Sequence, residues 1–377
     1  MPRPTQALVD LSSIRHNLGV VRRLVGPACK LLVPVKADAY GHGARPIARL
    51  CAQAAVDLLA VATVEEAIDL RDAGIRLPLV LLGNILPDET AAVVRHGLTA
   101  SLSDLGVADA LCRAARTGNT PVPVFAEVDT GMGRVGVHPW EEAHRFIADL
   151  ARRPELDLRC VFTHFPSADE PDRSFAREQI RRFRAVRQAV EAAGLRVPLW
   201  SMANSSAVCD LPEAHLDLVR PGIMVYGYRP AATCRAGDEL RPAMSLRSQV
   251  VFLKRVCRGT SLGYGRSYAV EADNSLVATV PIGYADGYPR ALSNRAPVLL
   301  GSQRYHVSGR VSMDQITVDL GPQAQVDVGD EVVLFGRQGD AMVSADELAT
   351  LLGTIVYELT CGISKRVPRV WLHEDPA

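Results

Sequence analysis

Apolar residues in the first 225 positions form short continuous runs, and between these runs they recur with helical spacing. Residues 14–25 carry an apolar side chain every three or four positions, with two serines before them and Gly26 after them, which predicts a capped helix. The sequence Thr63-Val-Glu-Glu66 has the pattern of a capping box, so a second helix is expected to begin there and to end at Gly74. Eight apolar runs have the length and composition of buried strands: 31–35, 58–62, 79–82, 99–102, 122–128, 159–163, 199–202 and 216–219.

Strands that are apolar on both faces and alternate with helices are typical of a parallel sheet covered on both sides. Eight such strand–helix units in roughly 220 residues fit a TIM-type (β/α)8 barrel, whose usual size is ~250 residues. The predicted fold class is therefore α/β, with the barrel over residues 10–235.

The helical spacing largely ends near Gly237, and short apolar runs broken by Gly, Pro and Asp follow. These runs predict strands at 248–256, 275–281, 297–301, 315–320 and 330–335. Ser344-Ala-Asp-Glu347 is a second capping-box pattern and predicts a late helix leading into 348–352. A C-terminal, mostly antiparallel β domain is therefore expected over residues 236–377, with residues 1–9 packing on it.

Composition and charge exclude several classes of partner. The chain has 377 residues, enough for two domains or one large one, and 48% of them are hydrophobic, enough for a substantial core. Lys and Arg together number 42, as do Asp and Glu, so the zero net charge predicts neither a nucleic-acid nor a membrane partner. No apolar run approaches the ~20 residues of a membrane span, and the first residues lack the apolar core of a signal peptide, which predicts a cytoplasmic protein.

The eight cysteines form no CxxC pair, and most of them lie in apolar surroundings. In a chain of this length the pattern predicts reduced, buried thiols rather than a disulfide framework or a zinc site. We therefore expect no metal ion as a cofactor.

Polar, often glycine-rich segments follow five of the expected strands: 36–43, 127–134, 163–165, 203–206 and 220–223. In barrels of this type the active site lies at the C-terminal ends of the strands. The five segments would meet at that end, which is the predicted functional site.

Lys36 ends the apolar run VPVK, where a barrel would direct its side chain toward the central mouth. Desolvation there favours the neutral, nucleophilic amine, although a lysine that extends from a strand end into solvent would explain the same position. Ser205 and Gly222 follow the seventh and eighth strands, which is the frequent phosphate site of such barrels. A nucleophilic lysine opposite a phosphate site is what pyridoxal 5'-phosphate (PLP) requires.

Nine motifs in order resemble those of the alanine racemase family, a PLP-dependent family of fold type III, and they span Lys36 to Arg369. They are VKADAYGHG, DTGMGRVG, THF, ANSSA, VRPGI, GYGRSY, IGYADG, SMDQ and YELTCGISKRVPR. The resemblance implies a PLP-binding barrel followed by a β domain, and an amino acid as the small-molecule substrate. It also implies a homodimer in which each active site combines one subunit's barrel with the other subunit's β domain.

The resemblance assigns the two groups that move protons. Lys36 forms a Schiff base with PLP and is one acid/base, and Tyr264 of the GYGRSY motif, contributed by the partner subunit, is the other. Two groups make chemical sense because racemisation removes a proton from one face of Cα and returns one to the opposite face. An amine of reference pKa ~10.4 and a phenol of ~10 both need help from a cationic site to act near neutral pH.

The remaining matches concern the binding of cofactor and substrate. Five residues correspond to the family's phosphate-binding positions: Tyr40, Ser205, Gly222, Ile223 and Tyr357. Others correspond to positions near the cofactor ring (His164), at the cofactor's phenolic oxygen and the substrate (Arg134), and in the substrate carboxylate region (Met313 and Asp314). Tyr284 of IGYADG resembles a gate on the entry channel.

Arg220 corresponds to the position that faces the pyridine nitrogen of PLP and that bonds to His164. Because an arginine does not readily give up a proton, with a pKa above ~12, a ring nitrogen beside it stays unprotonated. PLP would then be a weaker electron sink, which should discourage side reactions such as transamination. A salt bridge at the barrel mouth is the alternative interpretation of Arg220.

Glu127 departs from the family pattern, in which a carbamylated lysine often stands seven residues before the arginine of DTGMGR. A carbamate places a carboxylate at the end of a lysine, and glutamate supplies a carboxylate directly. We therefore expect Glu127 to orient Arg134, although its shorter side chain requires a movement of Arg134 or a bridging water or anion. An ordinary barrel salt bridge is the alternative here.

The predicted function is the interconversion of L- and D-alanine, which supplies D-alanine for peptidoglycan. A racemase for serine or a basic amino acid would keep the same fold. An amino-acid decarboxylase would too, but it should carry an acidic partner for the pyridine nitrogen, and Arg220 counts against it. A non-enzymatic PLP-carrier barrel would lack the C-terminal domain, so Tyr264, Tyr357 and the Met313–Asp314 pair count against that function.

Overall fold

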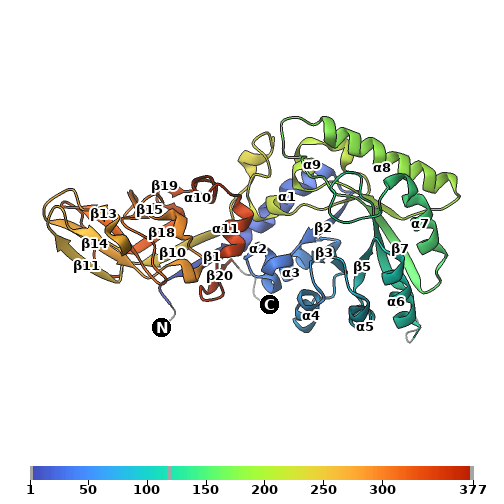
Figure 1. Cartoon of the computed structure of the whole chain (residues 1–377), viewed down its shortest axis with the longest axis horizontal. Coiled ribbons are helices and arrows are strands. Elements are labelled where there is room, and N and C mark those ends of the chain that lie inside the picture. Colours follow the sequence, from blue (N-terminus) through green and yellow to red (C-terminus); the bar gives the residue numbers. More distant parts are fainter. Residues whose placement is uncertain (1–2, 117–119, 374–377) are drawn as a thin grey trace. The chain divides into compact units, whose positions relative to one another are not determined.

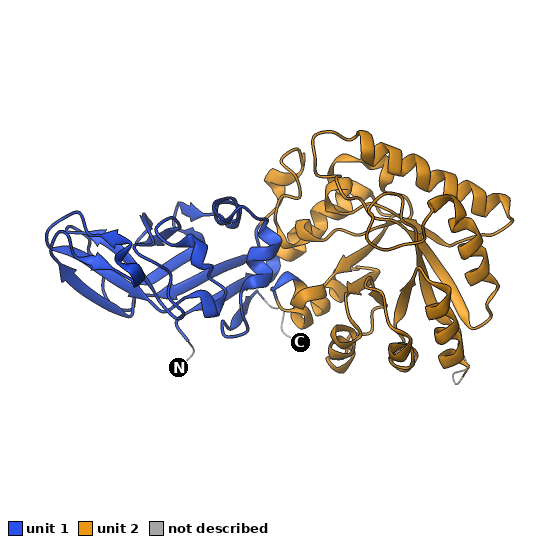
Figure 2. Ribbon diagram, in the orientation of Figure 1, with its two compact units in different colours: residues 1–12, 40–42, 242–377 blue, residues 13–39, 43–241 orange. Residues whose placement is uncertain are grey.

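The computed structural model describes residues 3–116 and 120–373, which divide into two compact units (Figure 2). The barrel unit comprises the described residues of 13–39 and 43–241. The β unit comprises those of 1–12, 40–42 and 242–377. Residues 40–42 thus belong to the β unit although they follow the first barrel strand closely along the chain.

Eight parallel strands close into a barrel, which confirms the predicted fold class. The strands are β2 (Lys30–Pro34), β3 (Leu58–Val61), β4 (Leu79–Leu81), β5 (Thr99–Leu102), β6 (Val122–Glu127), β7 (Leu156–Phe162), β8 (Leu199–Ser201) and β9 (Leu218–Val219). Every predicted apolar run forms one of them, although β7 begins earlier than predicted and β9 keeps only two residues.

One buried cluster joins side chains from six of these strands: Leu32, Ala60, Val80, Phe125, Cys160, Phe162 and Leu218. The two phenylalanine rings meet edge to face, with their centroids 6.2 Å apart. Complete burial of each such ring contributes about 1.5–3 kcal/mol to folding. Because side chains alternate between the faces of a strand, this cluster also fixes which later residues of each strand share its face.

Helices cover the outside of the barrel strands in Figure 1. They are α1 (Leu11–Val25), α3 (Ala44–Gln53), α4 (Val64–Asp72), α5 (Thr90–Arg95), α6 (Leu105–Ala115), α7 (Ala143–Arg152) and α8 (Ser174–Ala192), and a short α9 (Ser205–Asp210) follows β8. Thr63 caps α4 as predicted, since its Oγ1 accepts from the Glu66 amide at 3.3 Å. The other half of the predicted capping box is wrong, because the Glu66 carboxylate accepts from the amides of Ala37 and Ala62.

The β unit holds three sheets and is mostly antiparallel, as predicted. Its seven-stranded sheet has the order β16-β15-β18-β10-β1-β20, with β19 paired to β18. These strands are β1 (Gln6–Asp10), β10 (Met244–Gln249), β15 (Pro297–Leu300), β16 (Gln303–His306), β18 (Glu331–Gln338), β19 (Ala341–Val343) and β20 (Arg369–Leu372). A second sheet contains β11 (Phe252–Val256), β14 (Ser275–Val280) and β17 (Ile316–Gly321), and β12 (Ser261–Leu262) pairs with β13 (Tyr268–Ala269).

One strand prediction for this unit is wrong, and several short strands and one helix were not predicted. The single strand expected at 248–256 is two strands, because β10 pairs with β18 in one sheet while β11 pairs with β14 in another. The late helix is confirmed as α10 (Ala345–Leu352), with Ser344 Oγ accepting from the Glu347 amide at 3.0 Å. A further helix, α11 (Val356–Gly362), follows it and was not predicted.

A disulfide joins Cys209, on α9, to Cys234, so the expectation of reduced thiols is wrong for this pair. The two cysteines are 25 residues apart, and the turns after β8 and β9 bring their Cα atoms to 5.5 Å. Four other cysteines are buried thiols, and Cys257 and Cys361 are exposed thiols. Across the described ranges, every helix is too short or too polar to cross a bilayer.

Candidate active site

The side chains at the C-terminal end of the barrel follow from the alternation of the strands. Glu127 lies two residues after Phe125, and Arg220 lies two residues after Leu218, so both share the face of the buried cluster. Both are almost completely buried, with 4% and 5% of their surface exposed. Lys36 follows β2 on the same alternation from Leu32 and is half-buried.

The backbone after Lys36 turns with left-handed dihedral angles. Ala37, Asp38, Ala39 and Tyr40 have φ between 52° and 54°, a conformation that costs roughly 1–2 kcal/mol per non-glycine residue. The turn is held by its own hydrogen bonds, because the Ala39 amide donates to the Val35 carbonyl at 2.8 Å. The Asp38 carboxylate accepts from the Ala44 amide at 2.7 Å. The chain therefore turns away from the direction of β2 immediately after Lys36.

Arg220 is fixed by four hydrogen bonds from its guanidinium. Nη1 donates to Ser201 Oγ at 2.6 Å, and Nη2 donates to the carbonyl oxygens of Thr163 at 2.6 Å and Met202 at 3.4 Å and to His164 Nδ1 at 3.2 Å. The guanidinium also lies 5.2 Å from the ring centroid of Phe162. Burial lowers the pKa of Arg220 to about 10, so it remains a cation at neutral pH.

His164 is neutral in this environment. Desolvation, followed by the nearby cations Arg220, Arg134 and Lys36, lowers its pKa to about 3. A neutral imidazole can accept at Nδ1, which is what the contact with Arg220 requires. These electrostatic effects indicate that Lys36 and Arg134 lie near His164 together with Arg220.

Glu127 is a buried carboxyl group with incomplete hydrogen bonding. Its Oε2 has no hydrogen-bond partner, and desolvation raises its pKa to about 7 against the opposing effects of Arg220 and Arg134. Among the residues that the structure describes, none forms an ion pair with it within 4.0 Å, which contradicts the ordinary salt bridge considered from the sequence. An unsatisfied acceptor of this kind costs about 1–3 kcal/mol and indicates a group placed for a ligand or a moving side chain.

The loop after β6 carries Arg134 on its exposed side. The Asp129 carboxylate shapes this loop by accepting from the amides of Gly131 at 2.9 Å and Gly133 at 3.1 Å. These hydrogen bonds thus fix the backbone of the loop that carries Arg134, while the Arg134 side chain stays exposed to solvent.

Ser205 and Gly222 lie together after the last two strands. Ser205 Oγ accepts from the Gly222 amide at 2.8 Å and from the Met224 amide at 3.5 Å. Asn204 caps α9 by accepting from the Ala207 amide at 3.1 Å. The Ile223 amide lies at the start of a 3-10 turn (Ile223–Tyr226), a position suited to an anion.

The other predicted site residues lie in the β unit. Tyr264 and Met313 are exposed, at 69% and 52%, and Tyr284 is 43% exposed. The Tyr284 amide donates to the Ser312 carbonyl at 3.0 Å, which holds the turn of Tyr284 beside the segment of Met313. Asp314 accepts from Arg366 Nη2 at 2.8 Å.

Tyr40 and Tyr357 also belong to the β unit. Their rings pack with centroids 5.7 Å apart, and burial raises the pKa of Tyr40 well above its ordinary value. The Tyr40 phenol therefore stays protonated and can act as a hydrogen-bond donor.

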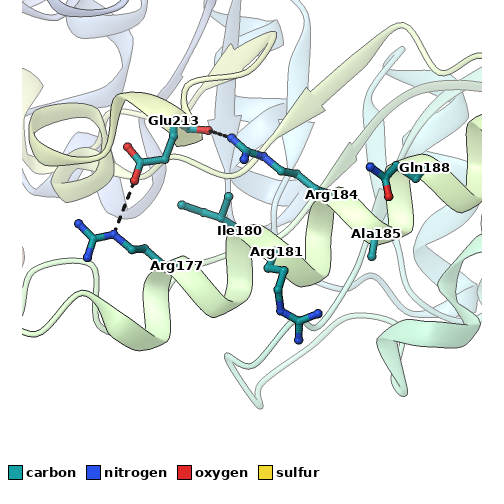
Figure 3. Close-up of a pocket in the computed structure, with 7 residues that line it drawn as sticks. All are labelled: Arg177, Ile180, Arg181, Arg184, Ala185, Gln188 and Glu213. Carbon is teal, nitrogen blue, oxygen red and sulfur yellow. Dashed lines mark hydrogen bonds and ion pairs between the residues drawn. The ribbon is translucent and has the colours of Figure 1, made fainter.

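A separate surface cavity of about 530 Å³ lies along α8, beside the turn that carries Glu213. Figure 3 shows Arg177 and Arg184 directed at Glu213. Arg177 Nε lies 4.0 Å from its carboxylate, and Arg184 Nη2 donates to its carbonyl at 3.2 Å. None of the predicted site residues lines this cavity, and these two cations already have partners within the protein.

Two family models match almost the whole chain. The alanine racemase N-terminal domain matches residues 9–230, and the alanine racemase C-terminal domain matches residues 243–371. The chain belongs to the alanine racemase family. The predicted family is therefore confirmed.

Individual relatives agree with this assignment. The chain is 45% identical to the alanine racemase of Desulfovibrio desulfuricans, over 98% of each sequence. It is 42% identical to that of Desulforamulus reducens, over 99% of this chain and 100% of the relative. A solved alanine racemase of Clostridium difficile 630 is similar with a TM-score of 0.93 and 36% identity, covering 99% of this chain and 96% of that one.

The alanine racemase motifs pointed to most of the side chains above, but two positioning contacts were missed. Asp286, in the IGYADG motif, is completely buried, and Arg3 donates to both of its oxygens, at 2.6 and 2.8 Å. Glu66 was interpreted only as part of a helix cap. A buried acidic residue and an arginine near the start of the chain carry no local pattern that links them, so the sequence offered no signal for this pair.

Proposed function

We propose that this chain is a PLP-dependent racemase that interconverts L- and D-alanine. The observation that carries the proposal is the group at the end of the barrel, where half-buried Lys36 lies near a fixed cation, Arg220, and a neutral histidine, His164. Membership of the alanine racemase family supports alanine as the substrate. We place the reaction in the cytoplasm, where it would supply D-alanine for peptidoglycan.

The residues of the barrel mouth fit PLP chemically. Lys36 supplies an amine for covalent attachment, while the Ser205 hydroxyl and the Ile223 amide would hold the phosphate. Gly222, whose amide donates to Ser205 Oγ, would orient that hydroxyl toward it. We assign Tyr40 and Tyr357 to the same phosphate from their match to the family motifs. Bound PLP would withdraw electrons from the substrate Cα and so make its hydrogen acidic.

Two groups of the protein would move the proton. Lys36 Nζ takes or returns it on one face of the substrate Cα, and Tyr264 Oη of a partner subunit acts on the opposite face. Tyr264 is 69% exposed in its own chain, which suits a side chain that completes the site of a partner. We therefore propose a homodimer as the active form.

Arg220 would set the type of reaction. Its pKa of about 10 keeps it charged, so it can donate a hydrogen bond to a ring nitrogen but does not protonate that nitrogen near neutral pH. The electron sink stays weak, and the proton returns to Cα in preference to side reactions. A decarboxylase of this fold would need an acid at this position.

Glu127 would hold Arg134 in place for the cofactor's phenolic oxygen and the substrate carboxylate. Its unpartnered Oε2 and the electrostatic influence of Arg134 on its pKa support this role. Met313 and Asp314 would line the carboxylate region, and Tyr284 would control entry.

The direct test supplies the purified protein with PLP and L-alanine and measures D-alanine by chiral chromatography, with serine, lysine and arginine in parallel. We expect D-alanine to form at least tenfold faster than any other D-amino acid. Faster conversion of serine or of a basic amino acid would replace alanine as the substrate. Bound PLP without any D-amino acid would favour a cofactor carrier.

A further inference from the structure

The hydrogen-bond ladder between β2 and β3 is interrupted at Lys36. The Val35 amide donates to the Ala60 carbonyl at 2.7 Å, which is a regular rung of a parallel pair. The next rung would join the Ala62 amide to the Val35 carbonyl. That carbonyl instead accepts from the Ala39 amide at 2.8 Å, because the chain has entered its left-handed turn. The turn therefore deprives the Ala62 amide of its ladder partner.

The Glu66 carboxylate replaces the missing rung. Its Oε2 accepts from the Ala62 amide at 2.7 Å, and its Oε1 accepts from the Ala37 amide at 2.6 Å. The Ala37 nitrogen belongs to the peptide group that joins it to Lys36. One carboxylate thus connects the end of β3 with the peptide group that joins Lys36 to Ala37.

The position of Glu66 is itself fixed. It lies in the first turn of α4, where its own amide donates to Thr63 Oγ1 at 3.3 Å and where the helix dipole favours a negative charge. Both atoms that it faces are N–H donors, and each of its two carboxylate oxygens accepts from one of them. Glu65, on the same turn, is exposed to solvent.

We propose that Glu66 is a positioning residue for Lys36. Its carboxylate fixes the Lys36–Ala37 peptide and so the direction in which the lysine amine leaves the strand toward the cofactor. The inference rests on the proposed role of Lys36, and it adds a residue that acts through the backbone without touching the reacting atoms.

The test follows the covalent attachment of PLP to the apo-protein. Glu66→Ala removes both acceptors, whereas Glu66→Gln keeps one oxygen and sets its NH2 group against the other donor. Glu65→Gln and Glu65→Ala are matched controls, because they remove the same charge from the same helical turn. For each protein we would measure the rate and affinity of PLP attachment by absorbance, the thermal unfolding midpoint, and the attachment site by borohydride reduction and peptide mass spectrometry.

We expect Glu66→Ala to slow attachment and to weaken PLP affinity at least tenfold, with Glu66→Gln intermediate and both Glu65 variants within twofold of the wild type. Wild-type attachment in both Glu66 variants would overturn the inference, and so would a lower unfolding midpoint with an unchanged attachment rate. If Glu66→Ala does not fold, Glu66→Gln decides by the same criteria. A wild-type protein without an adduct on Lys36 would overturn the proposed function and this inference with it, whereas a wild-type adduct with unaffected variants overturns the inference alone.

Discussion

The guanidinium of Arg220 donates to the Nδ1 atom of His164 across 3.2 Å. A charged histidine could not accept this bond, and the pKa of His164 near 3 keeps the ring neutral over the physiological range. The positive charge of this pair therefore belongs to Arg220, and His164 helps to orient that charge.

This contact predicts a pH dependence of stability. Unfolding returns His164 to a reference pKa of about 6.5, so between pH 6.5 and 3 the unfolded state binds a proton that the folded state does not, and stability falls with pH. Lowering the pH from 8 to 5 should cost about 2 kcal/mol through this group. In urea unfolding at both pH values, His164→Gln should remove about that part of the loss. His306→Gln, on an exposed strand position, controls for the loss of an imidazole. An equal pH response in His164→Gln and the wild type would contradict the assigned charge state.

Replacing Glu127 should stabilise the folded protein and weaken its function. Its folded pKa of about 7 lies above the ordinary value, so its contribution to stability is present at low pH and is lost as pH rises through 7. Glu127→Gln should therefore raise the free energy of unfolding at pH 8 by about 1–3 kcal/mol. It should also raise the KM for alanine roughly tenfold at pH 8 and much less at pH 6, because only the carboxylate can hold Arg134. Glu141→Gln, on the exposed turn before α7, is the control. Unchanged kinetics would remove Glu127 from the site.

The Arg3–Asp286 pair predicts strong destabilisation when one partner is removed. Asp286 is completely buried and also accepts from the Gly283 amide at 3.0 Å, so Asp286→Ala removes the acceptor of three hydrogen bonds, two from Arg3 and one from Gly283. We expect a loss of about 3–5 kcal/mol in chemical denaturation. Arg23→Ala breaks an exposed pair with Glu239 and should cost less than about 1 kcal/mol. Similar losses of unfolding free energy in the two variants would show that the buried pair stabilises the protein no more than the exposed pair does.

The proposed sharing of each active site between two subunits predicts complementation between two inactive variants. Lys36→Ala and Tyr264→Phe should each abolish racemisation as homodimers. In a mixed dimer, one site would combine an intact Lys36 with an intact Tyr264, so random reassociation of equal amounts should restore about one quarter of wild-type activity. Mixing without prior dissociation is the control. If both residues served the same site from one subunit, the mixture would stay inactive.

The sequence predicted the barrel because its strands are short apolar runs that need no knowledge of their partners. It did not predict the split of 248–256, because the apolar pattern continues through Val250 and Val251 while the pairing partners change. The disulfide was missed for a similar reason, since the approach of Cys209 and Cys234 depends on the turns around them.

The candidate site was predicted through its motifs, but the left-handed turn that follows Lys36 was not. Ala37 and Ala39 are not glycines, and an alanine side chain does not favour positive φ. The turn exists because tertiary contacts, including those of Glu66, compensate for its local cost. The motifs likewise gave Glu127 a role without revealing that its carboxyl group is buried without an ion-pair partner among the described residues.

The central claim is that one group removes the Cα proton and another group returns one. The most direct measurement follows L-alanine in heavy water during the first turnovers, with mass spectrometry of D-alanine after chiral separation. Two groups predict that newly formed D-alanine carries deuterium at Cα, because the returning proton comes from a second group that exchanges with solvent, while unreacted L-alanine carries little. D-alanine that retains its original hydrogen at Cα would contradict the account, because it would mean that a single group carries the proton across.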